Sequence, residues 1–562
     1  MKKYFLYTLV FASVLITFAT CKKSFLDESL YSSYAPETLS DSLGVESSLS
    51  GMYYNFSQWY TYSGEQGWLC VWQAGTDIVY PVQPVGWEIP YTNYSLLIST
   101  DGAAQHAWQW AYRLISDANT IIQTVHSSAT EKVMSEAGRN EDEAEARFFR
   151  GYAYEKLVTL FGAVPLITTP VSGPVTNFIR TSLDSVNSQI ISDLSFAAQY
   201  LPDVNNVKSN SNGPMYERVN KAAAQQELAI TYLRTGDPTD ALVQTQSIIG
   251  SGDFTLINKR YGVDAGQPGD YYHDMFIYGN QRRKQGNSEA IWVLEQENPS
   301  TVNGGISDDA QMRRVWGAAY YQMPGMIICD SLGGRGIGRM RLNNWFLYGL
   351  YQDGDIRNSQ YNVKRNYYYN NPTYAKYGQL IMLGDGGSVK NDSLWKICGE
   401  TTKWFAFDPN DLFGYATIKD IIVMRLGETY LLQAEAQVDL GNYADAATSI
   451  NVLRQRAFAN YPVQGMVMPS DISSSGNKGL DFILDERARE LVAEENRRET
   501  LMRMGLLYER VQSHIAPSEE ASAGLLPYPV QQLTTDKAKY LPIPQSEIDL
   551  NKDAVLAQNP GY

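Results

Sequence analysis

Apolar residues recur at helical spacing on both sides of two similar hexads, GDPTDA at residues 236–241 and GNYADA at residues 441–446. In each case one apolar stripe ends before the glycine and another begins after the turn. The stripes are Ala224, Leu228, Tyr232 and Ala241, Thr245, Ile249 around the first hexad, and Ile422, Leu426, Tyr430, Ala434 and Ala446, Ile450, Leu453, Ala457 around the second. Gly236 breaks a helix, Asp237 can cap the next one, and Pro238 suits its first turn. This pattern predicts the antiparallel helix pairs of tetratricopeptide-like repeats.

Further stretches with a helical pattern extend this scaffold. Residues 108–125 and 141–162 each carry one apolar face, and another helix is predicted from Leu480 to about Met504. In that last segment acids precede bases by four positions, at Asp485/Arg489, Glu494/Arg498 and Glu499/Arg503. Such pairs support an exposed helix face, so we interpret the charges there as a solvated surface.

Residues 251–419 have a different pattern, rich in Gly, Asn, Tyr and Trp, broken by proline and with little helical periodicity. We expect loops and short strands here, carried on a helical frame where binding surfaces commonly lie. The predicted fold class is therefore mostly α. A single domain, residues 21–562, would combine a helical scaffold at 40–250 and 415–562 with a loop-rich, partly β insert at about 251–419.

The start of the chain has the pattern of a secretory signal. Lys2 and Lys3 precede 17 uncharged, mostly apolar residues at 4–20, and Cys21 stands where the sequence becomes polar. As a helix this run would extend roughly 25 Å, short of a hydrocarbon core of roughly 30 Å. We therefore favour a lipoprotein signal peptide at residues 1–20, cut before Cys21, which then carries the lipid. An ordinary signal peptide and an anchor helix are the alternatives.

Composition narrows the classes of function. The formal net charge of −15 argues against a nucleic-acid partner, because phosphate binding requires a basic face. Apart from Cys21, the cysteines are Cys70, Cys329 and Cys398, without CxxC spacing, and the chain has four histidines. Neither a zinc site nor a disulfide framework is predicted, although one cysteine pair could close in an oxidising compartment. We expect no metal, no cofactor and no catalytic residue.

Three local motifs match functional sites only in part. The acids Glu141, Asp142, Glu143 and Glu145 precede an apolar helix, where we expect them to complement the helix dipole rather than to form a glycosidase pair. GGRGIG at 333–338 lacks the third glycine of a dinucleotide loop. DGDIRN at 353–358 has an arginine at the fifth position of a calcium loop, so a calcium site is not supported.

Longer segments carry a family resemblance. They are ARFFRGYAYEKLVTLFGAVPLIT at 146–168, DIIVMRLGETYLLQAEAQVDLGNYADAATSINVLRQRA at 420–457, ILDERARELVAEENRRETLMRMG at 483–505 and YLPIPQSEIDLNKDAVLAQNPGY at 540–562, with FLD at 25–27 and DGDIR at 353–357. In order and spacing they resemble the SusD/RagB family of Bacteroidetes outer-membrane lipoproteins. One departure is Arg498-Glu499-Thr500-Leu501, where that family tends to have Arg-Trp-Asp-Leu.

The resemblance implies a function as well as a tetratricopeptide-like fold. A member of this family would be anchored by lipid at Cys21 to the outer membrane, facing outward. It would cap a SusC-like TonB-dependent barrel and hand that transporter a captured nutrient, usually a glycan. It would not be an enzyme.

Glycan capture needs exposed rings, because sugars stack their C–H faces on Trp and Tyr and hydrogen-bond to polar side chains. The predicted ligand-binding residues are Trp68, Trp72, Trp87 and Tyr91, which lie in Gly- and Pro-rich sequence, with Asp77, Trp316 and Tyr320 added by the resemblance. By contrast, Trp108 with Tyr112, and Tyr53 with Phe56, have helical spacing and are predicted to pack in the core.

Two alternative functions stay open. A similar lipoprotein could capture peptides, which favour an acidic or polar cavity with backbone partners over exposed stacking rings. A surface glycoside hydrolase is the least favoured hypothesis.

Overall fold

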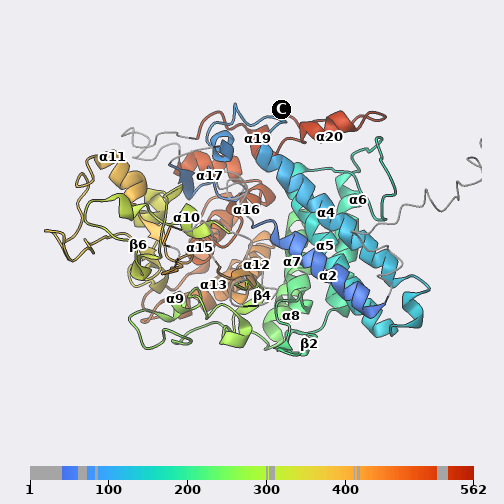
Figure 1. Cartoon of the computed structure of the whole chain (residues 1–562), viewed down its shortest axis with the longest axis horizontal. Helices are drawn as coiled ribbons and strands as arrows, with labels where there is room; N and C mark the ends of the chain where they lie inside the picture. The colour runs from blue at the N-terminus through green and yellow to red at the C-terminus, as the bar shows by residue number, and fades with distance from the viewer. Residues whose placement is uncertain are drawn as a thin grey trace, which may run out of the picture.

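The computed structural model describes residues 41–60, 72–82, 86–298, 302, 310–410, 412–413, 418–515 and 530–562. In the first half of the chain, long helices pack side by side (Figure 1). Their bounds are α2 Ser42–Ser57, α4 Gly102–Val125, α5 Glu136–Phe161, α6 Leu183–Tyr200, α7 Lys221–Thr235 and α8 Pro238–Gly250. α5 packs against both α4 and α6, and α7 packs against both α6 and α8.

The two hexads form the turns that their pattern predicts. α7 and α8 flank the first hexad, and α12 (Leu426–Asp439) and α13 (Tyr443–Ala457) flank the second. Gly236 and Gly441 have φ of 84° and 74°, in the left-handed region that favours glycine. Asp237 occupies the N-cap position of α8, but its side chain makes no capping hydrogen bond. α8 packs against α12, so the two helix pairs adjoin and the predicted mostly α fold is confirmed.

α5 begins earlier than the sequence pattern suggested. Ser135 Oγ accepts a hydrogen bond from Gly138 N at 3.1 Å, so the helix begins at Glu136. The acids at 141–145 therefore lie in its second and third turns, and the interpretation that they complement the helix N-terminus is wrong. Three of them pair with basic side chains instead, in the ion pairs His126–Glu143, Arg147–Glu143, Lys208–Asp142 and Arg218–Glu145.

The single helix predicted from Leu480 to Met504 is two helices, α15 (Leu480–Leu491) and α16 (Arg497–Arg503). The chain turns between them at Ala493, which has φ of 61°, and Asn496 Oδ1 accepts from Glu499 N to cap α16. The interpretation of this segment's charges as a solvated surface is also wrong. Most of its arginines are buried, and Arg487, Arg497 and Arg503 pair with the distant acids Glu428, Asp77 and Glu435.

The last elements of the chain are short helices. They are α14 Pro469–Ser473, α17 Leu507–His514, α19 Thr535–Lys539 and α20 Gln545–Leu550. Among the residues that the structure describes, no helix has both the length and the apolar composition needed to cross a membrane. The predicted signal peptide and Cys21 lie outside the described residues.

Residues 251–419 consist mainly of loops with short strands and helices, on the opposite side of the molecule from α4 and α5 (Figure 1). β4 (Ala290–Leu294) of this insert pairs antiparallel with β8 (Ile421–Arg425), which leads directly into α12. The other strand pairs are β1 Val79–Pro81 with β5 Met340–Leu342, β2 Ser209–Asn210 with β3 Gly213–Pro214, and β6 Val363–Lys364 with β7 Glu400–Thr401. The insert's short helices are α9 Tyr271–Asp274, α10 Met312–Trp316 and α11 Val389–Asn391. A small core of its own lies around Tyr320 and Tyr367.

A buried set of ion pairs joins the insert to the helical scaffold. We call it the Glu490 network; its members are Glu289, Asp355, Arg357, Arg425, Arg454, Arg456, Glu486 and Glu490. The DGDIR segment supplies Asp355 and Arg357, and Arg357 donates to Glu486 at 2.9 Å and to Glu490 at 3.0 Å. Although burial alone would raise the pKa of Glu490, Arg456, Arg425 and Arg357 hold it well below its usual range.

Replacing Glu490 by alanine should destabilise the fold strongly, because the buried guanidinium groups of Arg357, Arg425 and Arg456 each lose one of their carboxylate partners. The expected loss in free energy of unfolding is about 3–5 kcal/mol, which is the usual cost of removing one partner from a buried ion pair. Urea unfolding followed by circular dichroism measures it. Lys376→Ala, which removes an exposed pair with Asp385, is the control and should change the midpoint little. Equal, small losses in both variants would contradict a stabilising role for the network.

Candidate functional site

The structure places most of the predicted ligand-binding residues inside the protein. Trp72, Asp77, Tyr91, Trp316 and Tyr320 are buried, and Trp87 is half-buried against Gly102 at the start of α4. Trp68 lies outside the described residues. The structure therefore does not gather the predicted set on one exposed surface.

Asp77 is held by two arginines rather than left free for a sugar hydroxyl. Its carboxylate pairs with Arg497 at 2.6 Å and with Arg510 at 3.0 Å. Burial alone would raise the pKa of Asp77, but Arg497 and Arg510 hold it well below its usual range. These contacts tie the segment after Trp72 to α16 and α17, so Asp77 acts structurally here.

The buried tyrosines and Trp316 have structural partners too. Tyr91 donates to Asp101 Oδ1 at 3.0 Å, and the same oxygen caps α4. Tyr320 donates to the carbonyl of Gly334 at 2.7 Å and stacks on Tyr367 with ring centroids 6.4 Å apart. Trp316 belongs to the main core, whereas Tyr320 belongs to the insert's own core. The two rings therefore do not form an opposing pair around a ligand in this structure.

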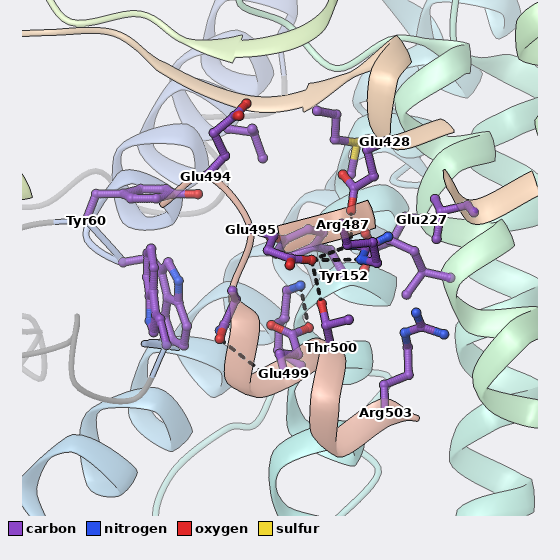
Figure 2. A pocket seen from close by; sticks show the side chains of 18 residues that line it. Tyr60, Tyr152, Glu227, Glu428, Arg487, Glu494, Glu495, Glu499, Thr500 and Arg503 are labelled. Carbon is purple, nitrogen blue, oxygen red and sulfur yellow. Dashed lines mark hydrogen bonds and ion pairs between the residues drawn. The ribbon is translucent and has the colours of Figure 1, made fainter. Parts of the chain in front are cut away.

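Trp72 lines a cleft between α5, α7, α12 and α16, which Figure 2 shows from close by. One side is aromatic: Trp59 and Trp72 stack with centroids 5.1 Å apart and an interplanar angle of 19°, and Tyr60 meets Trp72 edge-on at 5.0 Å. The cleft has a cavity volume of about 90 Å³. Typical ligand pockets enclose roughly 300–1,000 Å³, so a whole oligosaccharide does not fit inside it.

The other side of the cleft carries charged groups, most of which are paired. Lys156 Nζ lies 2.5 Å from Glu499 Oε1 and 4.5 Å from the centre of the Tyr152 ring. Arg487 bridges Glu428 and Glu495, both at 2.7 Å. We name it the Glu227 cleft, because the 1% exposed Glu227 lines it with a carboxylate oxygen, Oε1, that has no partner among the described residues.

A second and larger hollow lies on the insert. We call it the insert groove; it has a volume of about 430 Å³ and is bordered by Tyr361, Tyr368, Phe405, Gln360, Arg365 and Asn366. Tyr368 is 52% exposed, and Gln360 and Asn366 are exposed as well. Arg365 is fixed by donating from Nε to the carbonyl of Leu347 at 3.0 Å.

The insert groove combines ring faces with amide and guanidinium groups, the chemistry that sugar hydroxyls and C–H faces require. The sequence reasoning missed it, although the segment QYNVKRNYYYNNP at 360–372 alternates tyrosines with amides and bases. Its position beside β6 and the strand-to-loop segment at 402–405 brings those side chains together. Among the described residues, no group of three or more His, Cys, Asp or Glu side chains could hold a metal ion.

Comparison with known proteins identifies the family. The model described as "SusD family" matches residues 280–562, and the one described as "Starch-binding associating with outer membrane" matches residues 24–233. This chain therefore belongs to the SusD family, as the resemblance predicted.

Individual relatives agree with that assignment over the whole chain. SusD-like protein P25 of Formosa agariphila is 25% identical over 596 residues and covers 99% of each chain. A SusD homolog from Bacteroides thetaiotaomicron has the same fold, with a TM-score of 0.70 and 19% identity over 94% of this chain and 99% of the other. A laminarin-binding SusD-like protein has a TM-score of 0.67 and 20% identity over 93% and 100% of the two chains.

Glu227→Gln should stabilise the protein more at high pH than at low pH. Burial raises the pKa of Glu227 from 4.5 to about 8, against the opposing effect of Lys156. Because the folded state holds this proton more tightly, Glu227 weakens the fold progressively as the pH rises from 4.5 to about 8, by about 1.4 kcal/mol per unit. Thermal unfolding at about pH 5 and about pH 9 measures the difference between variant and wild type.

The matched control is Glu136→Gln, which makes the same chemical change at an exposed position in the first turn of α5. Its effect gives the baseline for losing an exposed carboxyl group. A Glu227→Gln difference that does not grow with pH would contradict a raised pKa.

Proposed function

We propose that this protein is a surface lipoprotein that captures a glycan and delivers it to a SusC-like TonB-dependent transporter in the outer membrane. The observation that carries the proposal is the family assignment, since one matching family model is described as starch-binding and associating with the outer membrane. Structural relatives include a laminarin-binding SusD-like protein and the surface glycan-binding protein A from Bacteroides fluxus. Lipid attachment at Cys21 would hold the protein at the membrane.

The insert groove is the surface that we propose for the glycan. Tyr368 and the half-buried Tyr361 offer ring faces, while Gln360, Asn366 and Arg365 offer hydrogen-bond donors and acceptors. Trp68 stays a proposed ring contact, and Trp87 stays a separate one, since it lies against Gly102 at the start of α4 and does not line the groove. Each aromatic contact contributes about 0.5–1.5 kcal/mol beyond area burial, so two or three rings together raise the affinity by about fivefold to two-thousandfold.

Binding, rather than bond cleavage, is the proposed activity. Capture needs no general acid, base or nucleophile, and Asp142, Glu143 and Glu145 are engaged in ion pairs with Lys208, Arg147 and Arg218. A peptide ligand would also find hydrogen-bond partners in the insert groove. The ligand test therefore includes peptides.

The chain from residue 22 onward should be retarded in native gels that contain at least one polysaccharide from a panel of plant, algal and microbial glycans. Stacking and hydroxyl contacts slow the protein where the polymer is fixed in the gel. If no polysaccharide retards the protein and calorimetry shows that peptides bind, the proposed ligand is a peptide instead of a glycan. Release of sugars from the retarding polymer by pure protein would contradict the binding-only proposal.

Tyr361→Ala and Tyr368→Ala should each weaken that retardation by about threefold to tenfold, because each removes one stacking face. Affinity electrophoresis over a range of polymer concentrations gives the dissociation constants. Tyr278→Ala removes an equally exposed tyrosine of the insert that does not line the groove, and should bind like wild type. Equal effects of all three substitutions would place the glycan elsewhere.

Cys21→Ala should release the protein from membranes, since the residue that carries the lipid is lost. Fractionation of cells followed by immunoblotting measures the share that sediments with the outer membrane. A Cys70→Ala variant is the control for loss of a thiol. Sedimentation of Cys21→Ala at the wild-type level would show that another feature anchors the protein.

A further inference from the structure

Five polar atoms of residues that line the Glu227 cleft have no hydrogen-bond partner within the described part of the chain (Figure 2). Three are donors, Trp72 Nε1, Asn496 Nδ2 and Arg487 Nη1, and two are acceptors, Glu227 Oε1 and Glu499 Oε2. Buried polar groups are nearly always paired, so several unpaired atoms around one cavity indicate a guest that pairs with them.

Glu227 gives the clearest indication of a guest. It is 1% exposed, and the other acids of the cleft have basic partners: Glu499 pairs with Lys156, while Glu428 and Glu495 pair with Arg487. Leaving a buried carboxyl oxygen without a partner costs free energy that a bound hydrogen-bond donor would offset.

The mixture of donors and acceptors restricts the chemistry of the guest. A cation would satisfy Glu227 and Glu499 but would meet the guanidinium of Arg487 and the ammonium of Lys156. An anion would satisfy the donors but would lie against the carboxyl groups of Glu227 and Glu499, which offer it only unpaired acceptor oxygens. A hydroxyl group both donates and accepts, so about two or three neighbouring hydroxyl groups can pair with all five atoms.

The aromatic side of the cleft fits the same guest. In Figure 2 Tyr60 lies on one side of the cleft, with Glu227, Arg487 and Arg503 on the other. The ring faces of Tyr60 and of the Trp59–Trp72 stack suit the C–H groups of a polyol. A cavity of about 90 Å³ accommodates a few water molecules or the hydroxyl-bearing edge of one sugar.

We propose that the Glu227 cleft is a second ligand site, which takes neighbouring hydroxyl groups of a neutral polyol. Glu227 and Glu499 accept from these hydroxyls, and Trp72, Asn496 and Arg487 donate to them. No residue lines both this cleft and the insert groove, so the two sites are separate. The polyol is either a small free molecule or the terminal sugar of a glycan; the second source rests on the proposed function.

The test is binding of glycerol and of the methyl glycosides of glucose, galactose and mannose to the purified full-length protein. Saturation-transfer NMR detects the contact, and calorimetry measures the affinity. Glu227→Gln keeps the size of the side chain but replaces one carboxyl oxygen by an amide NH₂ group, and Trp72→Phe keeps a ring but loses the Nε1 donor. Each should weaken binding at least about tenfold, because each disturbs a hydrogen bond inside a buried site.

Two controls and a third variant keep the test decisive. Glu136→Gln repeats the chemical change at an exposed site on α5, and Tyr368→Ala alters the insert groove; both should bind the polyols like wild type. Asn496→Ser can keep the side-chain cap on Glu499 N but loses the unpaired Nδ2 donor, so it should weaken binding even if Trp72→Phe does not fold. Near-ultraviolet circular dichroism checks the fold of every variant.

The proposal is overturned if no polyol binds, if the folded cleft variants bind like wild type, or if a crystal soaked with polyol holds water only in the cleft. If glycerol binds but no glycoside does, the site is supported and its ligand is a small free polyol. Binding of glycosides supports a sugar as its source. The proposed function fails by a different result. In that case no polysaccharide retards the protein in gels, whether or not a polyol binds in the Glu227 cleft.

Discussion

The fold depends on the pairing of buried charges around Glu490. Taking an arginine or a carboxylate out of water costs several kcal/mol, and only near-complete pairing offsets that cost. Glu490 accepts from Arg357 of the insert, from Arg425 at the end of β8 and from Arg456 on α13. These arginines come from three parts of the chain. All the ion pairs of Glu490 therefore form only when the insert, β8 and α13 are packed against α15, which carries Glu490. The Glu490 network thus fixes how the loop-rich half sits on the helical half.

Four of the segments that carry the family resemblance, at 353–357, 420–457, 483–505 and 540–562, contribute buried side chains that hold the fold together. DGDIR contributes Asp355 and Arg357 to the Glu490 network. The segment at 483–505 contributes Glu486 and Glu490 to it, and Arg497 to the separate pair with Asp77. At the C-terminus, Asn559 of QNPGY donates to the carbonyls of Phe161 and Leu541 and so holds the end of the chain against α5. These motifs specify a scaffold. The resemblance accordingly identifies the fold and the family, and leaves the choice of ligand to residues outside the motifs.

The sequence predicted the helix pairs because their apolar stripes follow the helical period, and Gly236 and Gly441 mark the turns. It could not predict the buried charges, because the i, i+4 rule sees only neighbours along one helix. Arg497 pairs with Asp77, 420 residues away, and no local pattern reveals such a partner. The sequence also failed to predict how deeply the aromatic side chains are buried. Glycines and prolines around Trp72 and Tyr91 indicate irregular backbone, yet both rings are buried, since the irregular segments here lie against α16 and the turn that precedes it.

The two candidate sites differ in how firmly the protein holds them. The Glu227 cleft is built from α5, α7, α12 and α16, and its Arg487 shares Glu495 with Arg497, which in turn pairs with Asp77. Its donors and acceptors are thus fixed before any ligand arrives, and little conformational entropy is lost on binding. The insert groove depends on loop side chains such as Gln360, Asn366 and Tyr368, which are exposed and must be ordered by the ligand. A rigid small cleft suits one defined chemical group, whereas an adaptable larger groove suits repeated units of a chain. The two sites differ in this way because the cleft is built mainly on helices and the groove mainly on loops.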